Sequence, residues 1–258
     1  MPTALITGAS AGLGEGFARE LARRGHDLIL TARRADRLHE IAAELRAGHG
    51  VAVHVFASDL AEPDAPERLL GDVAAAGLPI DTLINNAGFG LRGPFAEQDR
   101  AQALGMIDLN CRSLVALAHG VLPQMLERGA GGILNLASTA AFQPGPWMAV
   151  YYATKAFVLS FSEALHEEVQ GRGVRVTALC PGPTRTEFAS RAGMADMPLF
   201  TALASDAGGV VRDGLAALDA GRAVKVPGLM NALMADATRF TPRLLARKAA
   251  GSLQKRRG

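Results

Sequence analysis

The sequence is poor in the residues that crosslink small secreted proteins or hold metals. It has two cysteines, Cys111 and Cys180, which cannot form a disulfide framework and lack the paired spacing of metal ligands. The six histidines are also scattered, with no two at ligand spacing, at positions 26, 39, 49, 54, 119 and 166. We therefore expect no metal site, and the cysteine content suits a reducing cytosol.

Long apolar runs and a leader segment are missing as well. No stretch reaches the roughly 18 uninterrupted apolar residues of a membrane span. The N-terminal MPTALITGAS is too short in its apolar run and too poor in positive charge for a signal peptide. These features predict a cytoplasmic protein without a transmembrane segment.

Neither sign of charge dominates the whole chain, but its C-terminal part is strongly basic. The net formal charge of +2 gives no case for nucleic-acid binding. From Arg222 onward, nine lysines and arginines stand against Asp236 alone. This basic C-terminal extension, residues 222–258, can lie on an anionic membrane surface or meet an acidic carrier. We favour the alternative of a solvated helix, broken by Pro227 and Pro242, with its apolar side on its own domain. Peripheral membrane contact is the most that we expect.

The chain does have a regular alternation of short apolar runs and helical patterns. Runs such as TALIT, HDLILTA and GVRVTALC are apolar on both faces, which is typical of parallel strands covered by helices on both sides. The longest helical patterns cover residues 99–128 and about 151–170, and no repeat or linker divides the chain. The sequence predicts a single α/β domain over residues 1–258, with a doubly wound, Rossmann-like parallel sheet. The segment 187–205 fits neither period, and we expect it to be a substrate loop.

A glycine-rich turn follows the first strand run and opens the first helical pattern. In TGASAGLG, residues 7–14, Gly8 allows a sharp turn. Gly12 and Gly14 remove side chains where backbone approaches a pyrophosphate and where helix meets sheet. Strand, turn and helix stand in the order that phosphate binding requires, so the turn predicts a phosphate-bearing ligand.

The second strand run ends in TARRADRL, which bears on the kind of ligand. A site for a dinucleotide without a ribose phosphate would be expected to carry Asp or Glu at this strand end. Ala32 fills that position, and Arg33 and Arg34 follow, whose guanidinium groups attract a 2′-phosphate. Arg33 is the favoured phosphate ligand. Arg34 and Arg37 could instead form a solvated helix start.

Both tyrosines of the chain stand side by side in VYYATKAF, residues 150–157. Helical spacing puts Tyr151 and Lys155 on one face, while Tyr152 points about a quarter turn away. A phenol ionises at about pH 10, so it is a poor acid–base catalyst at neutral pH unless a nearby cation stabilises the phenolate. Lys155 is that cation, and we expect it to lower the pKa of Tyr151. Tyr152, with Ala156 at i+4, is assigned to packing.

Taken together, these motifs resemble the short-chain dehydrogenase/reductase family. The resemblance runs from Thr3 to about Thr186 and rests on TGASAGLG, NNAG at 85–88, Asn110, Ser138, Tyr151-x-x-x-Lys155 and PGPTRT at 181–186. It implies an oxidoreductase that transfers a hydride between a nicotinamide and a carbonyl or secondary alcohol. With the two arginines, NADP(H) is favoured over NAD(H).

The resemblance also implies four catalytic roles. Tyr151 would protonate a carbonyl oxygen in reduction, and Ser138 would hydrogen-bond that oxygen. Lys155 would lower the tyrosine pKa and hold the nicotinamide ribose, and Asn110 would hold a water that connects Lys155 to solvent. Taken alone, Ser138 could cap a turn and Asn110 could be an ordinary buried hydrogen-bonding residue.

Further cofactor contacts are implied in the same way. The glycine turn would contribute its backbone around the phosphates, with Asp59 and Leu60 at the adenine, Asn86 to Gly88 at the adenine ribose, and PGPTRT at the nicotinamide carboxamide. Asp59 could otherwise be a helix cap. The full set of expected cofactor residues is Gly8, Ser10, Ala11, Gly12, Leu13, Gly14, Arg33, Arg34, Asp59, Leu60, Asn86, Ala87, Gly88, Tyr151, Lys155, Pro181, Gly182, Thr184 and Thr186.

Apolar residues near the expected pocket opening favour a hydrophobic substrate over a sugar. They are Trp147, Met148, Met194, Met197, Leu199 and Phe200. They could instead pack a subunit contact, and the resemblance implies a homodimer or homotetramer built through the fourth and fifth helices. Two other functions stay open: an NAD-linked alcohol dehydrogenase working oxidatively, and a non-catalytic nucleotide-sensing protein.

Overall fold

The computed structural model describes residues 1–188, 192 and 204–254. In this part of the chain, seven strands form one parallel sheet in the order β3-β2-β1-β4-β5-β6-β7. The strands are β1 (Thr3–Thr7), β2 (Asp27–Thr31), β3 (Val53–Val55), β4 (Thr82–Asn85), β5 (Gly131–Leu136), β6 (Val174–Leu179) and β7 (Val224–Lys225). The predicted doubly wound, Rossmann-like sheet is confirmed.

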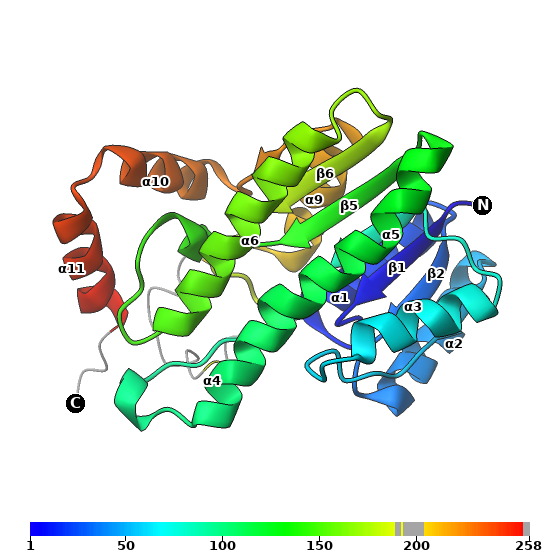
Figure 1. Cartoon of the computed structure of the whole chain (residues 1–258), viewed down its shortest axis with the longest axis horizontal. Coiled ribbons are helices and arrows are strands. Elements are labelled where there is room, and N and C mark those ends of the chain that lie inside the picture. The colour runs from blue at the N-terminus through cyan, green and yellow to red at the C-terminus, as the bar shows by residue number, and fades with distance from the viewer. Residues whose placement is uncertain (189–191, 193–203, 255–258) are drawn as a thin grey trace.

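Helices cover both faces of this sheet. The α-helices are α1 (Gly12–Arg23), α2 (Ala35–His49), α3 (Ala65–Ala75), α4 (Arg100–Ile107), α5 (Leu114–Arg128), α6 (Ala149–Glu168), α9 (Ala207–Asp219), α10 (Leu229–Phe240) and α11 (Arg243–Gln254). Helices α1, α2 and α9 pack on one face, and α3, α5 and α6 pack on the other. Figure 1 shows α5 and α6 in front of the strands, with α1 and α9 behind them.

The two cores follow from the alternation of side chains along each strand. A row of register partners, Ile29, Leu5, Leu83, Ile133 and Val176, crosses five strands and packs under α3, α5 and α6. The neighbouring positions on the same strands face α1, α2 and α9. Because both faces are buried, each central strand is apolar throughout, which is why these runs could be recognised in the sequence.

A short chain of buried polar side chains ties the middle of the sheet to α6. Asn85 on β4 donates through Nδ2 to Oδ1 of Asn135 on β5 at 3.0 Å. Asn135 donates in turn to Oγ of Ser162 on α6 at 2.9 Å. Ser162 donates to the Val158 carbonyl at 2.6 Å. All three linking side chains are buried, so each satisfies the next where water has no access.

The helix expected over residues 99–128 is not regular. It consists of α4, a π-helical segment over Asp108–Ser113 and α5. The π segment holds Asn110 and Cys111, and both are buried. Inserted π turns are frequent at functional sites because the extra residue redirects the backbone groups on one turn.

The C-terminal extension forms two helices, α10 and α11, which Pro242 separates. They lie at the edge of the molecule, beyond the strands (Figure 1). Their contacts with the domain are made by small residues such as Ala235, Ala246 and Ala250, which are buried. Their large apolar side chains are exposed, so the expectation of an apolar side packed on its own domain is wrong. No helix in the described part of the chain is both long enough and apolar enough to span a bilayer.

Candidate active site

A cavity of about 680 Å³ opens at the carboxyl ends of the central strands. Strand β1 pairs with both β2 and β4, so the strand order reverses between the first and second halves of the sheet. Crevices at such a reversal are the usual ligand sites of doubly wound folds. The loops that follow β1, β2, β4, β5 and β6 all contribute to the lining.

The glycine turn forms one wall of this cavity. Gly8 and Gly12 have φ angles of +65° and +57°, in the left-handed region that favours glycine. A Cβ on Gly14 would lie 2.2 Å from the Gly8 carbonyl oxygen, so the turn closes only on glycine there. Asn86 fastens the turn to β4, because its Nδ2 donates to the Thr7 carbonyl at 2.9 Å.

Helix α1 begins at this turn with its N-terminus towards the cavity. Its N-cap is Ala11, which has no side chain that could cap the first N–H groups. Gly8, Ser10, Ala11, Gly12 and Leu13 line the cavity as expected from the sequence. Gly14 does not line it, so its part is the close packing of helix against turn.

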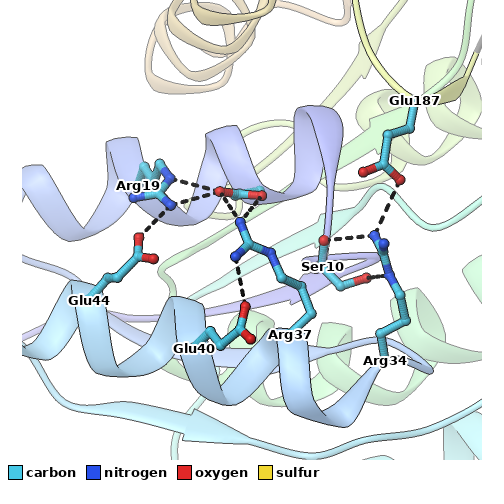
Figure 2. Close-up of polar contacts among 8 residues, drawn as sticks. Ser10, Arg19, Arg34, Arg37, Glu40, Glu44 and Glu187 are labelled. Carbon is cyan, nitrogen blue, oxygen red and sulfur yellow. Dashed lines mark hydrogen bonds and ion pairs between the residues drawn. The ribbon is translucent and has the colours of Figure 1, made fainter.

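The two arginines after β2 lie at this end of the cavity and differ in their contacts. Arg34 donates from Nη2 to the Ser10 carbonyl at 2.8 Å and from Nε to Ser10 Oγ at 3.3 Å. Its Nη2 also lies 3.4 Å from Oε2 of Glu187, as Figure 2 shows. Arg33 is more exposed, and its Nη1 lies 3.8 Å from Oδ2 of Asp59. Both arginines line the cavity, as do Asp59 and Leu60.

Arg37 is separate from this group. Its Nη1 donates to Glu40 at 2.9 Å and its Nη2 donates to Glu15 at 3.1 Å, so both ends of the guanidinium are held by carboxylates (Figure 2). Arg37 does not line the cavity. Arg37 therefore fits the helix-start role that was left open for it, whereas Arg34, which is the N-cap of α2, also lines the cavity. Asp59 accepts from the Ala61 backbone N–H at 3.1 Å, which stabilises a turn well before α3.

Ser138, Tyr151 and Lys155 meet at the other end of the cavity. All three line it, and Ser138 Oγ donates to the Pro181 carbonyl at 3.4 Å. Ser138 also accepts from the Ala140 backbone N–H at 3.1 Å, so it caps the short helix Thr139–Phe142 (η3) as well. Lys155 Nζ donates to the Leu136 carbonyl at 2.6 Å and lies 5.8 Å from the centre of the Tyr151 ring.

Burial dominates the electrostatics of this end. It raises the pKa of Tyr151 above its usual value, against a smaller lowering by the hydrogen bond from Ser138. Burial also lowers the pKa of Lys155 to about 8. The expected lowering of the tyrosine pKa by Lys155 is thus not what the protein shows: the pKa of Tyr151 moves in the opposite direction. The phenol is held in its neutral, proton-donating form.

Asn110 stands behind this group and does not line the cavity. Its Oδ1 accepts from the Phe89 backbone N–H at 3.1 Å, and its Nδ2 donates to the Phe89 carbonyl at 3.0 Å and to Thr154 Oγ1 at 3.1 Å. A Cβ on Gly88 would lie 2.9 Å from Asn110 Oδ1 and 3.7 Å from Lys155 Nζ. The Asn110 side chain is therefore committed to holding the loop after β4 against α6.

The loop after β6 closes the cavity. Pro181, Gly182, Thr184 and Thr186 line it, as do Asn86, Ala87 and Gly88 from the opposite loop. Thr184 Oγ1 donates to the Gly182 carbonyl at 3.0 Å. A Cβ on Gly12 would lie 3.3 Å from Thr186 Cβ, so the glycine turn and this loop are in close contact.

Sequence reasoning missed several lining residues. One of them is Leu91, which forms an apolar wall with the predicted Met148 and with Phe188 of the predicted substrate loop, whose ring lies 5.5 Å from that of Tyr151. Tyr152 was assigned to packing, and it packs on Gly145 but also lines the cavity. The other lining residues that were not predicted are Ala32, Ser58, Phe89, Gln102, Leu109, Leu136, Ala137, Thr139, Ala140 and Pro183.

The expected pocket opening is described only in part. Met148 lines the cavity, whereas Trp147 does not. Trp147 has a φ of +70°, a strained conformation for a bulky residue, and its carbonyl accepts from the Gly93 N–H at 2.8 Å. Met194, Met197, Leu199 and Phe200, and most of the predicted substrate loop 187–205, lie outside the described residues.

Comparisons with known proteins agree with this geometry. A family model for short chain dehydrogenase matches residues 2–196. Sulfoacetaldehyde reductase 2 of Chromohalobacter salexigens is 44% identical over 186 residues, which cover 71% of this chain and 73% of that protein. A solved short-chain dehydrogenase from Sphingobium yanoikuyae in complex with NADPH is 38% identical, with a TM-score of 0.84 and 93% of each chain covered. The bulky-bulky ketone specific alcohol dehydrogenase from Comamonas testosteroni is 32% identical, with a TM-score of 0.79, 93% of this chain and 92% of that chain.

Proposed function

Since the chain belongs to the short-chain dehydrogenase family and is an oxidoreductase of CH–OH and C=O groups, we propose that it is NADP(H)-dependent and acts on a lipophilic carbonyl or secondary alcohol. The observation that carries this proposal is the layout of one cavity. Ser138, Tyr151 and Lys155 lie at one end, and the glycine turn with Arg33 and Arg34 lies at the other.

The residues present fit a dinucleotide. The uncapped N-terminus of α1 offers free N–H groups for phosphates, and Gly8 and Gly12 have no side chains that would keep a pyrophosphate away. The arginines supply positive charge where a 2′-phosphate is expected, and Ala32 leaves no carboxylate there to repel it. These features support NADP(H) over NAD(H), as does the NADPH complex of the Sphingobium yanoikuyae enzyme.

When bound, the nicotinamide supplies or accepts the hydride. Tyr151 donates its proton to the carbonyl oxygen in reduction, and Ser138 donates a hydrogen bond to the same oxygen. The buried, neutral phenol suits this step, because a developing alkoxide is a much stronger base than a phenolate. Burial lowers the pKa of Lys155 to about 8, which is close to neutral pH. The Lys155 ammonium group can therefore return a proton to the Tyr151 phenolate after the tyrosine has donated its own. Asn110 acts by holding the surrounding backbone.

A lipophilic substrate is supported by the apolar wall beside Tyr151. Met148, Phe188 and Leu91 form this wall. The similar alcohol dehydrogenase from Comamonas testosteroni, which is described as specific for bulky-bulky ketones, also supports a lipophilic substrate. A small sulfonated aldehyde is the second candidate, because of the relative with 44% identity. Among the described lining residues, however, Lys155 is the one basic side chain at this end, and it already binds the Leu136 carbonyl.

The function is tested with the purified protein, NADPH or NADH, and a panel of bulky ketones alongside sulfoacetaldehyde, by following absorbance of the reduced ring. We expect turnover of the ketones with NADPH. Turnover restricted to sulfoacetaldehyde would contradict the substrate class, and equal use of NADH would contradict the cofactor.

Tyr151→Phe tests the catalytic group, with Tyr152→Phe as its matched control. Tyr151→Phe removes the proton donor and should lower kcat by several orders of magnitude while cofactor binding stays nearly unchanged. Tyr152→Phe keeps the ring that packs on Gly145 and should stay active. Equal losses of activity in the two variants would contradict the assignment of Tyr151 as the proton donor by its helical register with Lys155.

The assembly and location of the enzyme belong to the same proposal. We propose one domain acting in the cytoplasm as a homodimer or homotetramer, with α4, α5 and α6 at the subunit contact. Support comes from α6, where Phe157 is exposed and stacks on Phe161 at 6.1 Å between ring centres. Sedimentation of the purified enzyme tests this, and a monomer would contradict it.

A further inference from the structure

Helices α10 and α11 present large apolar side chains to solvent. We call this set the C-terminal apolar surface: Leu229, Met230, Leu233, Met234, Phe240, Leu244 and Leu245. Phe240 is 88% exposed and Leu229 is 79% exposed. Single exposed apolar residues are ordinary, but a set gathered on two adjoining helices marks an interaction site.

The helices are held so that this surface faces away from the domain. On α10, positions 229, 230, 233 and 234 form one stripe, and the opposite side carries Ala235. The α10 side chain Asn231 fits against Gly182, where a Cβ would lie 2.6 Å from Asn231 Oδ1. On α11, a Cβ on Gly251 would lie 3.3 Å from Pro146 Cγ. Small residues make the contacts, and the large ones are left outside.

The charges around this surface are mostly positive. Arg243, Arg247 and Lys248 are exposed on α11, and from residue 222 to the end of the chain Asp236 is the one acidic residue. The sequence adds Lys255, Arg256 and Arg257, which lie outside the described residues. The family match ends at residue 196, so these helices are not part of the region that defines the oxidoreductase.

We propose that the C-terminal apolar surface and its basic residues bind peripherally to an anionic lipid bilayer. Amphipathic helices with Leu, Met and Phe on one side and Lys or Arg on the other lie at the boundary of headgroups and acyl chains. Anionic headgroups would supply negative charge opposite the basic residues that surround the C-terminal apolar surface. A second copy fits less well, because a two-fold contact through this surface would bring two predominantly basic surfaces together.

The test is flotation of the full chain with vesicles of phosphatidylcholine alone and of phosphatidylcholine with phosphatidylglycerol. We expect binding to the anionic vesicles at low salt, and loss of that binding at high salt because the attraction is screened. No binding to anionic vesicles, or equal binding to both kinds, would overturn the proposal. Since the assay measures no turnover, its result is separate from that of the proposed reaction.

Two matched pairs of variants locate the surface. Arg247→Gln with Lys248→Gln should weaken anionic-vesicle binding by about thirtyfold, whereas Arg100→Gln with Arg172→Gln, at exposed positions elsewhere, should not. Phe240→Ser should weaken it by about tenfold, whereas Phe95→Ser, another exposed phenylalanine, should not. Equal effects within a pair would overturn the location.

Sedimentation without lipid decides between the bilayer and a second copy. If Phe240→Ser or the Arg247 and Lys248 variant dissociates the enzyme into smaller species, the surface is a subunit contact and the lipid proposal is wrong. Unchanged sedimentation and unchanged circular dichroism, together with weaker vesicle binding, support it.

Discussion

Arginine substitutions at the end of β2 test how the enzyme recognises the ribose phosphate of its coenzyme. Arg34 is already held by two hydrogen bonds to Ser10, at 2.8 and 3.3 Å, so little rotamer freedom is lost when it meets a phosphate. The Arg33 side chain is 71% exposed, and its Nη1 lies 3.8 Å from Oδ2 of Asp59. Arg33 therefore loses more conformational entropy when it binds a phosphate, and solvent screens its charge more strongly. We therefore expect Arg34 to contribute more than Arg33.

The magnitude follows from these environments. A hydrogen bond to a charged group contributes about 1.5–3 kcal/mol, and partial exposure places Arg34 at the lower end. Arg34→Ala should then weaken NADPH binding by about tenfold or slightly more, while Arg33→Ala, at about 1 kcal/mol, should weaken it by about fivefold. Binding of NADH, which has no 2′-phosphate, should change much less. The ratio of the two dissociation constants is the quantity that reports the phosphate contact.

Fluorescence titration of NADPH and NADH measures this ratio, and Arg37→Ala is the matched control. Arg37 is on the same segment, but Glu15 and Glu40 hold both ends of its guanidinium, at 3.1 and 2.9 Å. Its removal should leave the ratio unchanged. An unchanged ratio in both Arg33→Ala and Arg34→Ala, or an equal change in Arg37→Ala, would refute the assignment of the phosphate site.

Two further predictions concern buried polar groups. Asn135→Leu removes the hydrogen bonds that Asn135 makes with Asn85 and Ser162, which keep only their bonds to the Leu114 and Val158 carbonyls. It should lower the free energy of unfolding by about 2 kcal/mol, measured by urea denaturation; a loss below about 0.5 kcal/mol would argue against the buried chain. Burial lowers the pKa of Lys155 from 10.5 to about 8, so between these values the unfolded state binds more protons and stability rises with pH. The free energy of unfolding of the wild-type protein, measured without coenzyme, should rise relative to that of Lys155→Met by up to about 3 kcal/mol across this pH window. A difference between the two proteins that does not change with pH would contradict the lowered pKa.

The features that depend on local pattern could be predicted from the sequence. Strands buried on both faces are apolar throughout, so they stand out between helical patterns, and the parallel sheet follows from that alternation. The turn at Gly8 and the i, i+4 pair of Tyr151 and Lys155 are likewise local. The structure brings both to one cavity, because the ends of parallel strands share one edge of the sheet.

Features that depend on contacts between residues distant in sequence, or on burial, could not be predicted. Nothing in DLNCRS marks the π-helical segment, because its extra residue is stabilised by contacts of Asn110 with Phe89 and Thr154, which are distant in sequence. Spacing predicted the close packing at the glycine turn, but it could not tell that Gly14 does not line the cavity. The rise in the pKa of Tyr151 comes from burial, which a helical register does not reveal.

The same limit explains the error over the C-terminal helices and gives it a functional meaning. Periodicity predicts that a helix has an apolar side, but it does not say whether that side meets its own domain or another phase. In this chain the side of α10 and α11 that carries small residues contacts Pro146 and the cavity-lining Gly182, and α10 also contacts the η3 helix that Ser138 caps. Under the two proposals, a bilayer bound to the large side therefore lies next to the end of the cavity that holds Tyr151. A lipophilic carbonyl compound concentrates in such a bilayer, so the surface would bring the enzyme to its substrate without any change in the catalytic groups.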